Sequence, residues 1–220
     1  TPITVLIMSM DLYKDKQDSM TPELQNKIIE TMERNITLLK DLSEDILTIS
    51  KIDEKKMEIE LSEFKLLDLI IDIVIFLKPF CQEKNVSFNI DIDKNIELKG
   101  DIKKIDQVFR IVLDNAIKYS FENSIVNINA IDNYKSQSNL VEKKDGVLIQ
   151  FKNHGIGISK EDLPHIFDRF YRASNVGDIS GTGLGLAIAK AIVQLHQGEI
   201  YIESKLGKST TFSIFFPKID

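Results

Sequence analysis

A helical seam over residues 24–50 is the feature that most constrains how this chain can fold. Apolar side chains recur there in alternating steps of four and three residues, and Asn35 occupies one of the seam positions. The seam consists of Ile28, Met32, Asn35, Leu39, Leu42, Ile46 and Ile49. This spacing is typical of a helix that buries one narrow face against other helices. The sequence therefore predicts a long helix that needs a helical partner.

A second, shorter helix is predicted just before this seam. Residues 3–14 carry apolar side chains at helical spacing, and a polar stretch over 14–22 separates the two helices. Thr21 followed by Pro22 is typical of an N-cap and a first-turn proline. The two helices form an antiparallel hairpin, which cannot bury its own seam. We expect residues 3–50 to pair with a second copy in a four-helix bundle, and the alternative is that the seam packs on the rest of the chain.

The period of the apolar pattern changes near residue 57, which predicts a domain boundary between residues 1–56 and 57–220. The second domain alternates helical and strand patterns without strict βαβ repeats. Its predicted helices cover residues 66 to about 84 (with a kink or end possible at Pro79), 102–119 (capped by Asp101) and 184–196. Its predicted strands cover residues 57–61, 86–92, 125–131, 147–152, 199–204 and 210–216. A polar loop is expected over 133–146. These patterns indicate an α+β protein, in which the hairpin precedes a two-layer α/β sandwich with a mixed sheet.

Composition excludes several classes of protein. The 220 residues carry a net charge of −6 and a sequence pI of about 5.2, so nucleic acid, which requires clustered basic residues, is not expected as a partner. The densest apolar run, residues 66–77, is short of the ~20 residues that span a bilayer, so no membrane segment is expected. One cysteine, Cys81, allows no internal disulfide and fits a reducing compartment.

Two glycine clusters suggest a phosphate-binding site. Gly155 and Gly157 follow the predicted strand over 147–152, and the run Gly-Thr-Gly-Leu-Gly-Leu at 181–186 precedes a predicted helix. Glycines allow close backbone approach, and the amides at a helix N-terminus attract phosphate. A dinucleotide-binding fingerprint would need a strand directly before the second cluster. A long loop precedes it instead, which excludes that interpretation.

Polar side chains near these glycines extend the prediction. Asn115 and Lys118 lie one turn apart on the predicted helix over 102–119. An amide oxygen can bind Mg²⁺, and a lysine can bind phosphate. The segment over 166–172 places aromatic residues beside arginines. It either covers a purine and pairs with phosphates or forms a solvated turn.

These four elements, in this order, resemble the nucleotide-binding domain of the sensor histidine kinases, whose superfamily includes gyrase and the chaperone and mismatch-repair ATPases. The resemblance implies that the chain binds ATP with Mg²⁺. It implies that Asn115 is the Mg²⁺ ligand and that Lys118 and Tyr119 lie near the phosphates and the sugar. A lid over roughly 159–180 would close on the nucleotide. The other ATP-binding residues that it implies are Asn153, Gly155, Gly157, Ile158, Tyr171, Arg172, Gly181, Thr182, Gly183, Leu184, Gly185, Leu186 and Thr210.

The resemblance also implies a reaction. A kinase of this family passes the γ-phosphate of ATP to a histidine on the first bundle helix, then to an aspartate on the receiver domain of a response regulator. That histidine is expected just upstream of residue 1, and Thr1 would match a threonine implicated in dephosphorylating the regulator. Lys118 and Arg172 would neutralise charge during phosphoryl transfer. The expected location is cytoplasmic, and His196 is expected to be structural.

Two positions depart from the family pattern. Asn153 stands where an aspartate usually recognises adenine, so we expect weaker binding without the charge. Ile111 stands where the hydrolysing relatives have a glutamate, so a general base for hydrolysis is missing there. These departures leave open a degenerate nucleotide-binding module that serves as a dimeric docking platform. An ATP-hydrolysing clamp is a third possibility, and Ile111 argues against it.

Overall fold

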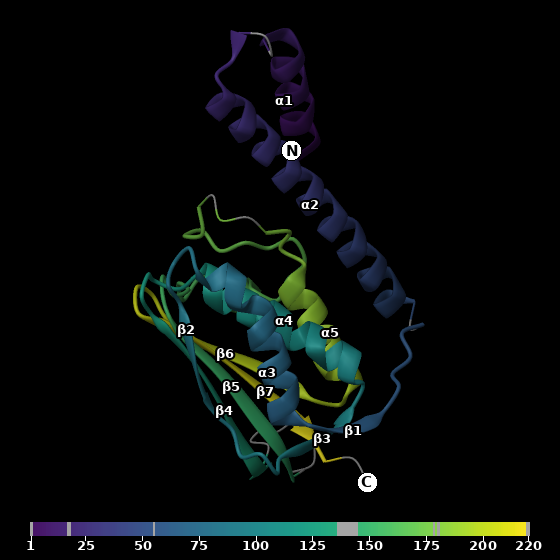
Figure 1. The fold of residues 1–220 in the computed structure, drawn as a ribbon. Coiled ribbons are helices and arrows are strands. Elements are labelled where there is room, and N and C mark those ends of the chain that lie inside the picture. The colour runs from purple at the N-terminus through teal and green to yellow at the C-terminus, as the bar shows by residue number, and fades with distance from the viewer. Residues whose placement is uncertain are drawn as a thin grey trace.

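The computed structural model describes residues 2–16, 19–54, 56–135, 145–177, 179 and 181–218. Helices α1 (Pro2–Lys16) and α2 (Pro22–Asp53) form the predicted antiparallel hairpin, which projects from the rest of the molecule (Figure 1). The Thr21 hydroxyl oxygen accepts a hydrogen bond from the Leu24 amide at 3.3 Å, and Pro22 begins α2. The N-cap and first-turn proline therefore start the long helix where the sequence predicted.

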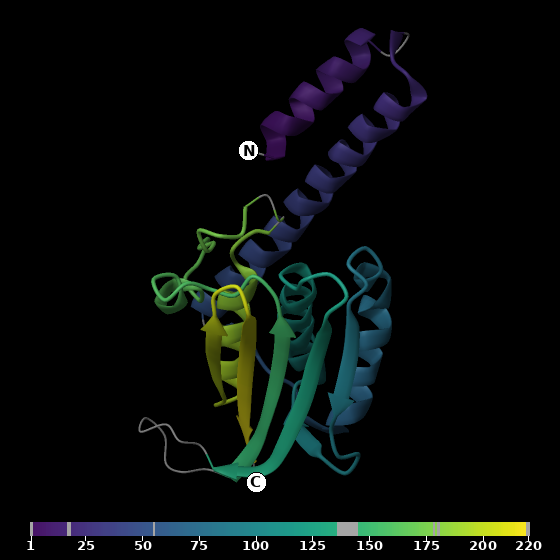
Figure 2. The same ribbon diagram turned by 90° about the vertical axis from the view of Figure 1, so that its left-hand side faces the viewer.

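The remaining described residues form a two-layer sandwich, in which three helices cover one face of a mixed sheet (Figure 2). The strands pair in the order β2-β4-β5-β7-β6; β2 and β4 are parallel, and the other pairs are antiparallel. The helices are α3 (Leu66–Leu77), α4 (Ile102–Lys118) and α5 (Gly185–Leu195), with short 3-10 turns η2 (Lys78–Cys81) and η3 (Leu163–His165). The sheet strands are β2 (Ser87–Asp91), β4 (Ile125–Lys135), β5 (Asp145–His154), β6 (Glu199–Lys205) and β7 (Ser209–Pro217). The predicted α+β class is confirmed.

The central helix α4 is held by burial of one apolar face. Its buried residues recur every three or four positions and meet the sheet on one side: Ile105, Val108, Phe109, Val112, Leu113, Ala116 and Ile117. Phe109 is fully buried and packs against Phe151 of β5 and Phe216 of β7, with ring centroids 5.4 and 6.3 Å away. The opposite, more polar face of α4 is free to carry functional side chains.

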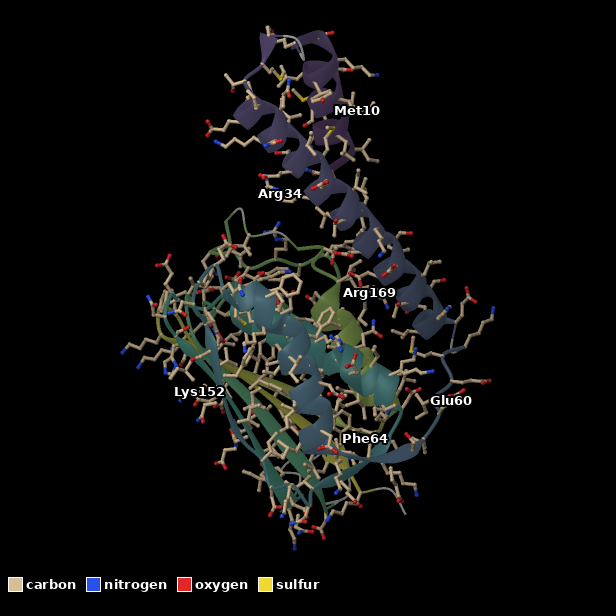
Figure 3. All side chains as sticks on the ribbon, in the orientation of Figure 1. Met10, Arg34, Glu60, Phe64, Lys152 and Arg169 are labelled. Atoms are coloured by element: carbon tan, nitrogen blue, oxygen red, sulfur yellow. The ribbon has the colours of Figure 1, made fainter. Side chains whose placement is uncertain are left out.

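Asp101 caps α4 as predicted and also anchors the segment that leads from α2. Its carboxylate accepts hydrogen bonds from the amides of Lys103 and Lys104, and from the amide of Glu60, each at 3.1 Å. Glu60 lies on the connection between α2 and β1 (Ser62–Lys65) (Figure 3). Burial alone would raise the pKa of Asp101, but these amides and the Lys104 charge outweigh it and hold that pKa below its ordinary value.

His196 is a structural residue that connects the end of α5 to the start of α4. It is 1% exposed, its Nε2 accepts from the Asp101 amide at 3.0 Å, and its Nδ1 lies 2.8 Å from the carbonyl of Ile192. The carbonyl can only accept, so Nδ1 carries the proton and the ring is neutral. Both ring nitrogens are used inside the fold, as expected for a structural histidine.

Several predicted boundaries were wrong. Residues 57–61 alternate apolar and polar side chains but form no strand, because the Glu60 amide bonds to Asp101 instead of to a neighbouring strand. The strand lies just beyond, at β1, which pairs with β3 (Glu97–Gly100), a strand that the sequence prediction missed. The helix predicted to reach about residue 84 ends at Leu77 in a 3-10 turn around Pro79, the residue that the sequence offered as its alternative end. Strands β4 and β5 extend into the predicted loop over 133–146, whose residues 136–144 lie outside the described part.

The seam of the hairpin is only partly covered. In the described residues α1 buries no side chain and α2 buries only Ile28, while Leu42 and Ile49 near the end of α2 pack against the core of the sandwich. Large apolar side chains along both helices stay exposed: Ile3, Val5, Ile7, Met8, Met10, Leu12, Leu24, Ile29, Ile36, Ile46 and Leu47. Among the helices that the structure describes, none combines the length and the apolar character needed to cross a membrane.

Candidate functional site

A cavity of about 330 Å³ lies between α4, α5, the ends of β5 and β7, and the segment that joins β5 to α5. Helix α2 covers its remaining side. Most residues predicted from the sequence line it: Asn115, Lys118, Tyr119, Asn153, Gly157, Ile158, Tyr171, Arg172, Gly181, Thr182, Gly183, Gly185, Leu186 and Thr210. The fold thus gathers side chains that are up to 95 residues apart in sequence into one pocket of the size that small ligands occupy.

The glycine run over 181–186 presents the start of α5 to this cavity. Gly185 begins the helix, and no side chain caps it, so its first amides remain available to an anion. Gly183 has φ +73°, and a Cβ there would lie 2.7 Å from the backbone of Phe170. Leu184 is fully buried in the core and does not line the cavity. The glycines of the run therefore let its backbone come close to a ligand, while the buried Leu184 side chain fixes the run to the core.

The polar face of α4 contributes the next group of side chains. The Asn115 amide nitrogen donates to the carbonyl of Ile111 at 2.8 Å, which leaves its oxygen as the group available to a ligand. Lys118 pairs with Asp114 at 2.6 Å. Burial raises the pKa of the Tyr119 phenol, partly offset by the nearby Lys118 charge. The cavity thus has an amide oxygen and a cation one turn apart.

The end of β5 forms the floor of the cavity. Asn153 lies opposite Thr210 of β7 in the sheet, and both side chains are buried. Gly155 does not line the cavity but lets two backbones meet, because a Cβ there would lie within 1.9 Å of the Tyr119 carbonyl oxygen. Gly157 adopts φ +65° beside the backbone of Lys205. Gly155 thus brings Asn153 against the end of α4, and of these two glycines only Gly157 lines the cavity.

The segment between η3 and the glycine run is held by its own polar contacts. The Tyr171 hydroxyl donates to Asp162 at 2.8 Å, and this bond lowers the pKa of the Asp162 carboxyl and raises that of the phenol. Arg172 donates to the carbonyl oxygens of Gly177 at 3.2 Å and Ile179 at 2.5 Å. Both side chains line the cavity, but in this conformation they are bound to the predicted lid segment itself.

Sequence reasoning missed the contribution of α2. Leu38, Asp41 and Asp45 line the cavity, and the Thr182 hydroxyl donates to the Asp45 carboxylate at 2.9 Å. Arg169, labelled beside α2 in Figure 3, forms two hydrogen bonds to Asp53, at 2.6 and 2.7 Å. The packing of α2 over the cavity produces no periodic pattern in the sequence. The acidic residues Asp41 and Asp45 were the available sign that this part of α2 contributes to a site. Thr1 lies outside the described residues.

The fold and the lining of the cavity are typical of an ATP-binding domain, and comparison with known proteins identifies the family. Residues 100–220 match the family described as "Histidine kinase-, DNA gyrase B-, and HSP90-like ATPase". The chain belongs to this family. Within it, the ATP-binding domain is of the sensor histidine kinase type, as the named relatives below indicate.

The chain is 34% identical, over 222 residues, to the signal transduction histidine-protein kinase ArlS of Staphylococcus aureus. That match covers 98% of this chain but 46% of ArlS, so the chain spans about half the length of this relative. The solved catalytic domain of histidine kinase ThkA is 27% identical with a TM-score of 0.60, covering 72% of this chain and 96% of that domain. The histidine kinase AdeS of Acinetobacter baumannii has the same fold over 100% of this chain and 96% of its own, at a TM-score of 0.76 and 21% identity.

Proposed function

We propose that this chain is the kinase portion of a two-component sensor histidine kinase, with residues 1–56 as the dimerisation hairpin and 57–220 as the ATP-binding domain. The observation that carries the proposal is the convergence at one cavity of the open start of α5, the Asn115 amide and the Lys118 cation. An anionic polyphosphate with a metal ion is the ligand that such a combination of groups fits.

The residues present fit a magnesium ion bound together with phosphates. Mg²⁺ prefers oxygen ligands and commonly binds through one or two protein oxygens plus substrate phosphates. The Asn115 amide nitrogen is committed to the Ile111 carbonyl, so the amide oxygen is the ligand atom. Groups of three or more His, Cys, Asp or Glu side chains that could hold a metal alone are absent from the described residues. When bound, Mg²⁺ would neutralise charge on the phosphates.

The two cations of the cavity must exchange partners when ATP binds. Lys118 is paired with Asp114, and Arg172 with carbonyls of the lid segment. Phosphate oxygens are stronger acceptors than carbonyls for a guanidinium group, so binding would draw Arg172 and the segment around it toward the nucleotide. The base would lie on the sheet floor near Asn153 and Thr210, away from the glycine run.

Phosphoryl transfer follows from this placement. The bond from the γ-phosphorus to the bridging oxygen of ADP breaks, a bond to the acceptor histidine nitrogen forms, and ADP leaves. Ile111 lines the cavity, and an alkyl group cannot activate water, which favours transfer to a side chain over hydrolysis. The acceptor is proposed on the helix that leads into α1, with transfer onward to an aspartate of a response regulator, whose dephosphorylation would involve Thr1.

The exposed apolar side chains of α1 and α2 support self-association of the hairpin through residues 3–50 into a four-helix bundle. A response regulator receiver domain is the proposed second partner. ThkA, a solved neighbour at 24% identity and a TM-score of 0.73 over 100% of this chain and 58% of its own, was crystallised with the response regulator TrrA. A cytoplasmic location is proposed with this function.

The decisive experiment uses a chain extended at its N-terminus to include the upstream helix, incubated with γ-labelled ATP and Mg²⁺. We expect label that is acid-labile and alkali-stable, lost when the upstream histidine is replaced by glutamine and lost in Asn115→Ala. Absence of such label from the folded, dimeric extended chain would contradict the kinase assignment.

A degenerate nucleotide-binding docking module is the second candidate, favoured by Asn153 and Ile111, the two residues that depart from the family pattern. The same experiment separates the two. Retained ATP binding without label on the histidine, even when an active partner bundle is supplied, would support the docking module.

A further inference from the structure

A chain of two side-chain hydrogen bonds links the floor of the cavity to the end of α4. Ser120 lies two residues beyond the end of α4, is 4% exposed, and donates its hydroxyl proton to the Ala116 carbonyl at 2.6 Å. Asn153 is 3% exposed, and its amide nitrogen donates to the Ser120 oxygen at 3.3 Å. The close approach of Gly155 to Tyr119 and the bridge between Ser120 and Gly155 hold the two side chains together.

Counting protons fixes the orientation of the Asn153 amide. A serine hydroxyl has one proton, and Ser120 gives it to Ala116, so its oxygen can only accept from Asn153. A flipped amide would bring its own oxygen against that oxygen, with no proton between them. The amide nitrogen therefore faces Ser120, and the amide oxygen is left for the cavity. In the described structure the Asn153 amide oxygen has no hydrogen-bond partner. Every fully buried side-chain nitrogen or oxygen among the described residues does have a partner, so this oxygen is accessible from the cavity.

We propose that Ser120 is a specificity-determining residue: its hydroxyl locks the Asn153 amide so that the site takes a 6-aminopurine and rejects a 6-oxopurine. A fixed acceptor pairs with the amino group of adenine. It opposes the carbonyl oxygen of guanine, because two acceptors would then meet in a buried site. This inference rests on the proposed nucleotide site and adds what selects its base.

The need for a lock is specific to an amide. An aspartate presents two acceptor oxygens, so its rotation changes nothing, whereas an asparagine presents an acceptor on one side and a donor on the other. Without the Ser120 hydroxyl, the Asn153 amide could turn its nitrogen to the base and pair with guanine. Ser120 thus gives Asn153 the preference for adenine over guanine that an aspartate at position 153 would have without a neighbouring hydroxyl.

The test compares Mg-ATP and Mg-GTP binding to the 220-residue chain by calorimetric titration, in wild type, Ser120→Ala, Asn153→Asp and the double variant. Wild type should prefer ATP, and Ser120→Ala should reduce the ATP-to-GTP affinity ratio about tenfold, the worth of one hydrogen bond, while both nucleotides still bind. In the Asn153→Asp background the same serine substitution should leave the ratio unchanged. Ser120→Thr, which keeps the hydroxyl, should keep the wild-type ratio.

The outcomes separate the two levels of the argument. A wild-type chain that binds neither nucleotide overturns the proposed function, and this inference with it. A wild-type chain that binds ATP, with a ratio unaffected by Ser120→Ala, overturns the lock alone. An equal loss of selectivity in the Asn153→Asp background would also overturn it, since the serine would then act through packing. If Ser120→Ala does not fold, the nearly isosteric Ser120→Cys, a poorer acceptor, carries the same expectations.

Discussion

The contact between Asp45 of α2 and Thr182 of the glycine run should oppose ATP binding. Thr182 donates its hydroxyl proton to Asp45 at 2.9 Å, and Asp41 lines the same cavity one turn earlier on α2. Phosphates bound at the start of α5 would compete for the Thr182 proton and would face these carboxylates. We therefore expect Asp45→Ala to tighten ATP binding.

The size of the effect follows from the bond that must break. Hydrogen bonds to charged groups contribute about 1.5–3 kcal/mol when they are buried. Asp45 is partly exposed, which screens the interaction and reduces it to about 1 kcal/mol. That corresponds to about a fivefold lower Kd for ATP.

Calorimetric titration of Mg-ATP into wild type, Asp45→Ala and Glu44→Ala measures this effect. Glu44 lies beside Asp45 on α2 and carries the same charge, but it does not line the cavity, so its removal should change the Kd little. An unchanged or higher Kd for Asp45→Ala would mean that Asp45 does not compete with the phosphates for Thr182. Equal tightening in Glu44→Ala would show that general charge on α2, and not the Thr182 contact, is responsible.

The contact should also depend on pH. Burial raises the pKa of Asp45 when α2 is docked; the Thr182 hydrogen bond opposes this, and the Asp41 and Glu44 charges add to it. Because the docked state has the raised pKa, the protonated carboxyl favours docking, and this contribution is lost as pH rises through the raised value. Docking of α2 over the cavity should therefore weaken over that pH range in wild type, seen as faster hydrogen exchange of the α2 amides around Asp45, and this pH dependence should be absent in Asp45→Asn.

Three further predictions concern the fold and the glycine run. Replacing Asp101 with alanine removes the α4 cap and should lower the free energy of unfolding in urea by about 1–2 kcal/mol, whereas Asp101→Asn should retain most of the capping energy. Because the pKa of Asp101 is lowered in the folded state, the stabilisation by its carboxylate should be present above the ordinary carboxyl pKa and should disappear as pH falls through the lowered value. Gly183→Ala places a Cβ 2.7 Å from the Phe170 backbone at φ +73°, so it should weaken ATP binding at least about tenfold in a calorimetric titration and also lower the thermal midpoint. Phe109→Ala empties a fully buried ring site and should cost about 3–5 kcal/mol in chemical unfolding, and a cost below 1 kcal/mol would contradict the packing.

The sequence predicted α4 well because independent signals coincide there. Its apolar period, the Asp101 cap and the polar face with Asn115 all specify one helix in one orientation. The glycine run was also predictable, since Gly183 adopts φ +73° beside the Phe170 backbone, a geometry that side chains rarely satisfy. Where chemistry and local structure impose the same residues, a single sequence is informative.

The sequence could not predict features that depend on distant partners. Residues 57–61 alternate because Met57 and Ile59 are half-buried, but strand formation needs a neighbour whose hydrogen bonds are free. Strand β3 is only four residues long and half polar, too short for a periodic signal. The docking of α2 over the cavity depends on how this helix packs against the sandwich, so the sequence alone gave no reason to place Asp45 at the site.

Calorimetric titration of the chain with ATP, with and without Mg²⁺, in wild type and Asn115→Ala, measures whether the cavity is a magnesium-dependent ATP site. We expect one nucleotide bound per wild-type chain, with an affinity raised by Mg²⁺, and a magnesium-dependent gain in affinity at least about tenfold smaller in Asn115→Ala. A wild-type chain that fails to bind ATP, or an Asn115→Ala chain whose affinity still rises fully with Mg²⁺, would contradict it.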